Sequence, residues 1–131
     1  MKVEKINYVQ IMVKDPEKAG KFFADLFSTE FTAVHESKEL DARLMMSSSL
    51  GIELLSPLTP DGPVATALER RGEGLSMLSL KVANVEEAAA EMESKGIRRI
   101  GQRRTGAALF HPKYSYGVMI ELLERDINQS T

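Results

Sequence analysis

The hydrophobic and polar positions of the chain follow one pattern twice. Residues 6–23 (INYVQIMVKDPEKAGKFF) and 75–92 (LSMLSLKVANVEEAAAEM) both begin with alternating residues, pass an Asp or Asn, and continue with helical spacing. Alternation with a period of two predicts a strand, and apolar residues at i, i+3, i+4 and i+7 predict an amphipathic helix. Asp15 before Pro16, and Asn84 in the second copy, are typical residues at a helix N-terminus. The sequence therefore predicts two strand–helix units.

Each predicted helix has one apolar face, which we expect to pack against a sheet. In the first helix this face consists of Ala19, Phe22, Phe23 and Leu26. In the second helix it consists of Val85, Ala88, Ala89 and Met92.

A second repeated pattern is the tetrapeptide IELL, at residues 52–55 and 120–123. Alternation places the Ile and first Leu of each copy on the core side of a strand, so that Glu53 and Glu121 point to the other side. An ionised carboxylate is costly to bury without a partner. We therefore expect both glutamates to face one cavity that supplies partners for them. A solvent-facing position, which is usual for a glutamate in a strand, is the alternative.

The segments between these patterns are mostly strand-like. The predicted strands are 29–36, 40–47, 51–56, 97–104, 106–111 and 117–124, and a linking helix is predicted at 64–72 after the turn sequence TPDGP. Each half is thus βαβββ, which predicts an α+β fold: two tandem βαβββ repeats forming a curved, partly closed mixed sheet with helices outside. We expect a single domain. Its parts are repeat one (about 4–58), the linking helix (62–72), repeat two (about 74–124) and a polar tail (125–131) frayed at DINQST.

Alternation also sorts the first strand of each repeat. Val9, Ile11 and Val13 suit the helix-covered face, which leaves Tyr8 and Gln10 on the inner face. In the second repeat, Leu78, Leu80 and Val82 face the helix, and Met77 and Ser79 face inward. Four inward positions thus form two equivalent pairs, Tyr8 with Met77 and Glu53 with Glu121.

The composition limits the kinds of partner and metal site that the chain can have. The 131 residues have a formal net charge of −2 and contain no cysteine, which argues against a nucleic-acid partner and excludes disulfides and thiolate metal sites. Only two histidines are present, His35 and His111, so a metal site with several histidines is hard to build. No apolar run approaches the roughly 20 residues of a membrane span. The first residues do not resemble a signal peptide, so we expect no membrane partner and a cytoplasmic location.

The duplicated βαβββ pattern resembles the vicinal oxygen chelate superfamily, which includes glyoxalase I, extradiol dioxygenases and bleomycin-resistance proteins. Within this superfamily, residues from about 4 to 124 resemble the methylmalonyl-CoA epimerases. The segments that carry it are INYVQIMVKDPEKAGKFF, IELLSPLTPDGPVATALERRGEGLSMLSLKV and LFHPKYSYGVMIELLE.

The resemblance implies a divalent metal held by His, Gln or Glu, His, and Glu. These positions are Tyr8, Glu53, Met77 and Glu121 here, so both histidines are replaced. A thioether and a phenol suit hard divalent ions poorly, and the two carboxylates alone would bind such an ion weakly. We expect no resident cofactor, although the resemblance itself implies a metal.

The resemblance also implies two acid/base groups, one on each side of an acidic α-carbon. One is Glu121, and the aligned position of the other is Arg43, which cannot act as a base. We expect Arg43 to lie with Glu53 and Glu121 on the inner surface, where it offsets one carboxylate and binds a substrate oxygen. A purely structural salt bridge is the alternative.

The remaining expected substrate contacts are Tyr8, Gln10, Met77, Ser79 and Lys113, although His111 and Lys113 also suit a role in fixing the turn before the last strand. An arginine cluster suits either the phosphates of a CoA ester or a charged edge strand. Its members are Arg70, Arg71, Arg98, Arg99, Arg103 and Arg104.

Three functions follow. The first is an enzyme that binds an acyl-CoA and isomerises it by α-proton transfer, as an epimerase or a glyoxalase-like lyase. The second is a metal-free protein that binds a small molecule, as the bleomycin-resistance proteins do, and the third is an inactive paralogue. The resemblance further implies a homodimer.

Overall fold

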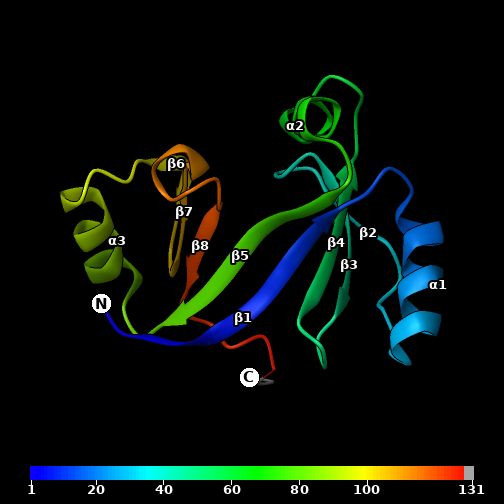
Figure 1. The fold of residues 1–131 in the computed structure, drawn as a ribbon, viewed down its shortest axis with the longest axis horizontal. Helices are drawn as coiled ribbons and strands as arrows, with labels where there is room; N and C mark the ends of the chain where they lie inside the picture. The colour runs from blue at the N-terminus through cyan, green and yellow to red at the C-terminus, as the bar shows by residue number, and fades with distance from the viewer. Residues whose placement is uncertain (129–131) are drawn as a thin grey trace. The chain divides into compact units, whose positions relative to one another are not determined.

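The computed structural model describes residues 1–128, and it has the predicted order of strands and helices (Figure 1). The strands are β1 (Val3–Met12), β2 (His35–Ser37), β3 (Ala42–Ser47), β4 (Ile52–Pro57), β5 (Gly74–Val82), β6 (Arg99–Arg104), β7 (Ala107–Phe110) and β8 (Ile120–Leu123). The helices are α1 (Pro16–Phe27), α2 (Pro63–Arg71), α3 (Val85–Ser94) and the short 3-10 helix η1 (Pro112–Tyr114). None of these helices of residues 1–128 has the length and apolar character needed to cross a bilayer.

The eight strands hydrogen-bond in the order β2-β3-β4-β1-β5-β8-β7-β6. β5 and β8 run parallel, whereas β2 with β3, β3 with β4, β6 with β7 and β7 with β8 are antiparallel, so the sheet is mixed. The chain divides into two compact units: unit 1 contains Met1–Val9 and the chain from Ser76 onward, and unit 2 contains Gln10–Leu75. The units therefore do not coincide with the two sequence repeats, because β1 and β5 each contribute to both.

In unit 1, α3 packs against β7 and β8 (Figure 1). Asn84 caps the helix by accepting a hydrogen bond from the Glu87 amide at 3.0 Å, as its sequence predicts. All four residues of the predicted apolar face of α3 are buried in a core with Val82, Ala108, Phe110 and Leu122. Leu122 belongs to the second IELL copy, so its core-facing side is confirmed.

In unit 2, α1 approaches the sheet through a glycine. A Cβ atom added to Gly20 would lie 2.7 Å from Met45 Cε and 4.0 Å from Leu54 Cδ1, so the helix backbone comes close to the sheet here and a larger residue would require the end of Met45 to move. The buried residues of α1 are Pro16 and Gly20, so the helix presents a different face to the sheet than the predicted one. Phe22 and Leu26, expected to face the sheet, are 60% and 59% exposed.

The strand predicted at 29–36 is mostly absent, and β2 occupies only His35–Ser37. Thr32 explains the difference, because its side-chain oxygen accepts a hydrogen bond from the Met46 amide at 3.1 Å. The side chain therefore takes a position that a backbone carbonyl would occupy in a regular ladder. The tail expected to fray is attached at its start, where Asp126 accepts a hydrogen bond from Lys5 Nζ at 2.8 Å. Residues 129–131 of that tail lie outside the described residues.

An ion-pair cluster joins β6 to α3. Glu86 accepts hydrogen bonds from Arg99 Nη1 at 3.0 Å and Nη2 at 3.2 Å, and Arg103 Nη1 lies 3.3 Å away. The hydrogen bond from Arg99 is the main reason that the pKa of Glu86 lies below its ordinary value. A carboxyl whose pKa is lower in the folded state stabilises the fold above its unfolded pKa, and this contribution disappears as the pH falls through the folded pKa.

We therefore expect Glu86→Gln to lower the melting temperature at about pH 7, and this effect to disappear as the pH falls through the lowered pKa of the folded state. Thermal unfolding followed by circular dichroism over a series of falling pH values measures this. Glu87→Gln is the matched control, because it removes a neighbouring charge from the first turn of α3. A pH-independent loss in Glu86→Gln, or an equal loss in both variants, would contradict this role of the cluster.

Candidate functional site

The carboxylate of Glu121 lies on the face of unit 1 opposite the α3 core. Glu121 pairs with Ser79 on β5 and with Leu109 on β7, so these three side chains share one face of the sheet. Leu122, the next residue, is fully buried in the core on the other face. Glu121 itself is only 6% exposed, and a carboxylate at this depth needs polar partners.

Three donors supply these partners. Tyr8 Oη donates to Glu121 Oε1 at 2.7 Å, and Ser79 Oγ donates to the same oxygen at 2.6 Å. Arg104 Nη2 donates to the other oxygen, Oε2, at 3.3 Å. Two hydroxyls therefore hold one oxygen, and a guanidinium lies beside the other. The structure brings the predicted site residues Tyr8, Ser79 and Glu121 together.

Arg104 is a site residue that the sequence analysis missed, because it was grouped with the other arginines. It reaches Glu121 because the chain reverses at Thr105–Gly106, where Gly106 has a φ of +72°. This places Arg104 opposite Ala107, and the pairing of β6 with β7 is irregular between Ile100 and Arg104. Ala107 lies two residues before Leu109, on the same face as Glu121. The short turn between β6 and β7 is the sequence signal that could have identified Arg104.

The second carboxylate has a different environment in unit 2. Gln10 Nε2 donates to Glu53 Oε1 at 2.7 Å, so the structure brings together two residues that were each predicted to face inward. Glu53 pairs with Met46 on β3, and Leu55 pairs with Leu44. The β3 side chains that share the face of Glu53 are therefore Ala42, Leu44 and Met46.

The predicted position of Arg43 is wrong. Arg43 pairs with Ser56, so it shares the face of Met45, which packs against α1, and lies on the opposite face from Glu53. Its Nη2 donates to Glu17 Oε1 on α1 at 3.1 Å. The error is one residue in register, and a shift of one residue moves a side chain to the other face of a strand. The salt bridge of Arg43 is with Glu17 on the side of α1, so the alternative of a structural salt bridge that fills the cavity is wrong as well.

The remaining residues predicted to contact substrate or to fix the last turn differ in their surroundings. Met77 is 9% exposed and lies two residues before Ser79, so strand alternation gives it the same face. Lys113 is exposed, and its Nζ lies 5.6 Å from the centre of the Tyr114 ring. His111 Nδ1 accepts a hydrogen bond from the Lys113 amide at 3.0 Å, which fixes η1 before the last strand. A contact of Lys113 with substrate stays a prediction.

The residues at the metal-ligand positions do not fit a divalent metal. Tyr8 uses its hydroxyl hydrogen to bond Glu121, so it is a phenol and not a phenolate ligand. Met77 offers only a thioether, which suits soft metal ions. Within residues 1–128, no group of three or more His, Asp or Glu side chains is placed to hold a metal ion.

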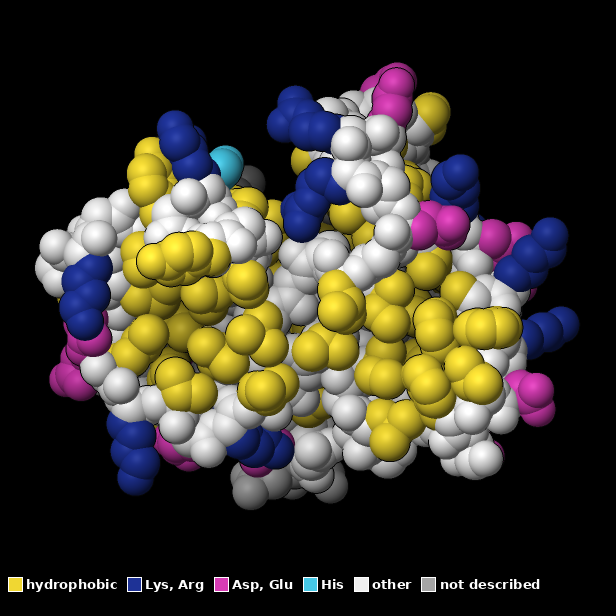
Figure 2. Space-filling model, viewed as in Figure 1, with side chains coloured by type: hydrophobic (Ala, Val, Ile, Leu, Met, Phe, Trp, Pro, Cys, Tyr) yellow, Lys and Arg dark blue, Asp and Glu magenta, His cyan; other side chains and the backbone are white. Residues whose placement is uncertain are grey.

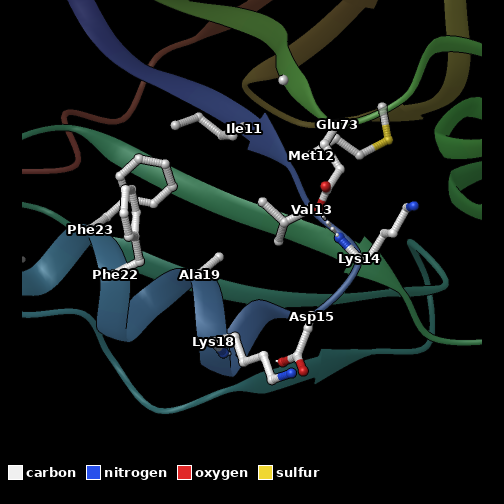
Figure 3. A pocket seen from close by; sticks show the side chains of 11 residues that line it. Ile11, Met12, Val13, Lys14, Asp15, Lys18, Ala19, Phe22, Phe23 and Glu73 are labelled. Atoms are coloured by element: carbon white, nitrogen blue, oxygen red, sulfur yellow. Dashed lines mark hydrogen bonds between the residues drawn. The ribbon is translucent and has the colours of Figure 1, made fainter.

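A cavity of about 500 Å³ lies elsewhere in unit 2, between β1 and α1 (Figure 3). Ile11 and Val13 point into it from one side, and Ala19 and the rings of Phe22 and Phe23 line the other. Its side chains are mostly apolar, and Ile11 and Val13 alternate along the chain with Gln10, the partner of Glu53. The cavity thus belongs to the helix side of β1 and not to the carboxylate side.

Known proteins are similar to the chain both in sequence and in fold. Residues 7–116 match the family model of the Glyoxalase/Bleomycin resistance protein/Dioxygenase superfamily. The mitochondrial methylmalonyl-CoA epimerase of Mus musculus is 28% identical over 130 residues, which cover 92% of this chain and 73% of the mouse protein.

Solved structures agree with this result. A methylmalonyl-CoA epimerase of Streptomyces coelicolor in complex with 2-nitronate-propionyl-CoA has a TM-score of 0.80 and 25% identity, covering 93% of this chain and 97% of that one. A methylmalonyl-CoA epimerase in complex with methylmalonyl-CoA and NH4+ also has a TM-score of 0.80 and 25% identity, covering 93% and 94%. These likenesses confirm the predicted fold class. The chain belongs to the Glyoxalase/Bleomycin resistance protein/Dioxygenase superfamily, and its relatives include methylmalonyl-CoA epimerases.

Proposed function

We propose that this protein binds an acyl-CoA thioester and exchanges the proton on its α-carbon, with Glu121 as the acid/base group. The observation that carries the proposal is a buried glutamate held by Tyr8, Ser79 and Arg104. It occurs in a chain whose relatives are named methylmalonyl-CoA epimerases, one of them in complex with methylmalonyl-CoA. We also propose that the protein is cytoplasmic, as expected from the sequence.

The geometry of Glu121 suits proton transfer. Tyr8 and Ser79 fix Oε1, so the orientation of the carboxylate is set before a substrate binds. A carboxylate oxygen takes the α-proton, the C–H electron pair moves into the thioester carbonyl to give an enolate, and the proton returns to carbon from the same carboxyl group. A general base placed in this way contributes about 10²–10⁴-fold in rate.

Negative charge develops on the thioester oxygen during this step, and fixed donors must stabilise it. Near Glu121, the Tyr8 hydroxyl already donates to the carboxylate, which leaves the guanidinium of Arg104 as the nearby positive charge. We propose that this charge favours the step without a direct hydrogen bond to the thioester. We also propose that the reaction uses no resident metal, since the residues do not fit a divalent metal.

One observation favours a second candidate function, which is ligand binding without turnover. The resemblance places a second acid/base group on β3, and the β3 side chains on the face of Glu53 are Ala42, Leu44 and Met46. None of them can transfer a proton. A protein with this β3 strand is expected to be poor at inverting an α-carbon, even where it still binds the ester.

We also propose that two copies of the chain associate through unit 2. Phe22, Leu26 and Phe27 of α1 are 60%, 59% and 44% exposed, and apolar side chains gather over α1 at the right of Figure 2. The apolar cavity lies beside these residues. A surface with both a projecting aromatic ring and an apolar hollow can complement itself across a two-fold axis. A second copy is therefore the partner that fits this face.

The first prediction concerns exchange in deuterium oxide. We expect the protein to incorporate deuterium into methylmalonyl-CoA, and Glu121→Gln to reduce the rate by about 10²–10⁴-fold because the proton acceptor is lost. Mass spectrometry of the ester measures this, and Glu87→Gln controls for the loss of one carboxylate. If the protein incorporates no deuterium above background while still binding the ester, ligand binding without turnover becomes the better function.

The second prediction concerns metal. We expect the natural protein to bind Co²⁺ weakly, and Tyr8→His with Met77→His to bind it about 100-fold or more tightly, because imidazole suits this ion and a thioether does not. Isothermal titration calorimetry measures both affinities. Tyr8→Phe with Met77→Leu is the control, since it alters the same positions without adding ligands. Tight binding by the natural protein would argue against a metal-free reaction.

The third prediction concerns assembly. We expect Phe22→Asp with Leu26→Asp to convert a dimer into a monomer, because two charges would be buried in an apolar interface. Sedimentation velocity gives the mass of each form. Lys21→Asp changes an exposed residue of the same helix and is expected to leave the dimer intact. A natural protein that sediments as a monomer at all concentrations would contradict the proposed interface.

A further inference from the structure

The three arginines of β6 have different partners. Arg99 and Arg103 both contact Glu86 on α3, as described above. Arg104, at the end of the strand, contacts Glu121. One arginine of the run has thus been turned to the opposite face by the irregular pairing before the turn.

Arg104 retains donors for a ligand. A guanidinium has five N–H groups in a fixed fork. Within residues 1–128, the side chain of Arg104 donates one hydrogen bond, from Nη2 to Glu121 Oε2 at 3.3 Å. Its side chain is 39% exposed, whereas that of Glu121 is 8% exposed. Arg104 therefore lies on the solvent side of the carboxylate, with most of its N–H groups available.

The charge of this arrangement matters for an anionic ligand. A buried carboxylate such as Glu121 repels a second carboxylate, and a cation placed beside it offsets that repulsion. Arginine also binds carboxylates through two parallel hydrogen bonds, which a point charge such as lysine cannot reproduce.

We propose that Arg104 binds the free carboxylate of a dicarboxylic acyl thioester, and so makes the protein select malonyl-type esters over monocarboxylic ones. This inference rests on the proposed function, because it concerns the ligand of the same site. Arg104 is a specificity-determining residue in this proposal, and Glu121 remains the group that transfers the proton.

The test compares two esters and two neighbouring arginines. Methylmalonyl-CoA and propionyl-CoA share the CoA moiety, and only the first carries a free carboxylate. We expect Arg104→Gln to weaken binding of methylmalonyl-CoA by about 10-fold or more, as expected when a charge-assisted hydrogen-bonded pair is lost. The same change should alter binding of propionyl-CoA by less than about 2-fold, since that ester makes no such pair. Arg103→Gln is the matched control and should leave both affinities unchanged.

Isothermal titration calorimetry gives these dissociation constants. Arg104→Lys keeps the charge without the fork, and should show a smaller loss that is again confined to methylmalonyl-CoA; it also serves if Arg104→Gln does not fold. Equal weakening of both esters would mean that Arg104 binds CoA phosphates or only supports the fold, and would overturn the proposal. Unchanged binding of methylmalonyl-CoA would overturn it as well. A natural protein that binds neither ester would instead refute the proposed function itself.

Discussion

The buried carboxylate of Glu121 is the constraint around which unit 1 is organised on its inner face. An ionised side chain loses several kcal/mol of hydration when it leaves water, so it persists in an apolar strand only with donors on both oxygens. Those donors come from three different strands, since Tyr8 lies on β1, Ser79 on β5 and Arg104 on β6. Each strand must therefore hold its register relative to β8. The α3 core on the other face supplies that register, because Leu122 and Phe110 are fully buried there.

The two IELL copies show that one motif can be accommodated in two ways. Glu53 receives a neutral amide from Gln10, whereas Glu121 receives two hydroxyls and a guanidinium. The carboxylate acceptor makes each of these hydrogen bonds charge-assisted. Glu121 is the more deeply buried of the two, and a guanidinium is among its donors. These surroundings support the chemical role proposed for Glu121.

Alternation within a strand was sufficient to predict which face each IELL residue occupies, because the apolar neighbours fix the core side. Resemblance to a family fixes the face of a residue less well. The resemblance aligns Arg43 with an acid/base position, but the pairing of β3 with β4 places its side chain on the face of α1. Arg104 could not be distinguished from its neighbours, because its direction depends on the turn at Thr105–Gly106 and on irregular pairing. The outward side of α1 could not be predicted for a similar reason, since periodicity identifies an apolar stripe but does not show that the helix packs through Pro16 and Gly20 instead.

A guanidinium beside Glu121 offers a ligand one positive charge, where a divalent metal would offer two. A single positive charge balances Glu121 alone, so a carboxylate ligand that joins the pair leaves an excess of one negative charge. Such a ligand is held by the directed hydrogen bonds of the guanidinium more than by net charge. Arg104 is also partly exposed, and salt screens interactions that reach solvent. A site built in this way should therefore hold its acyl group more weakly than a metal would, and depend on the rest of the ester for affinity.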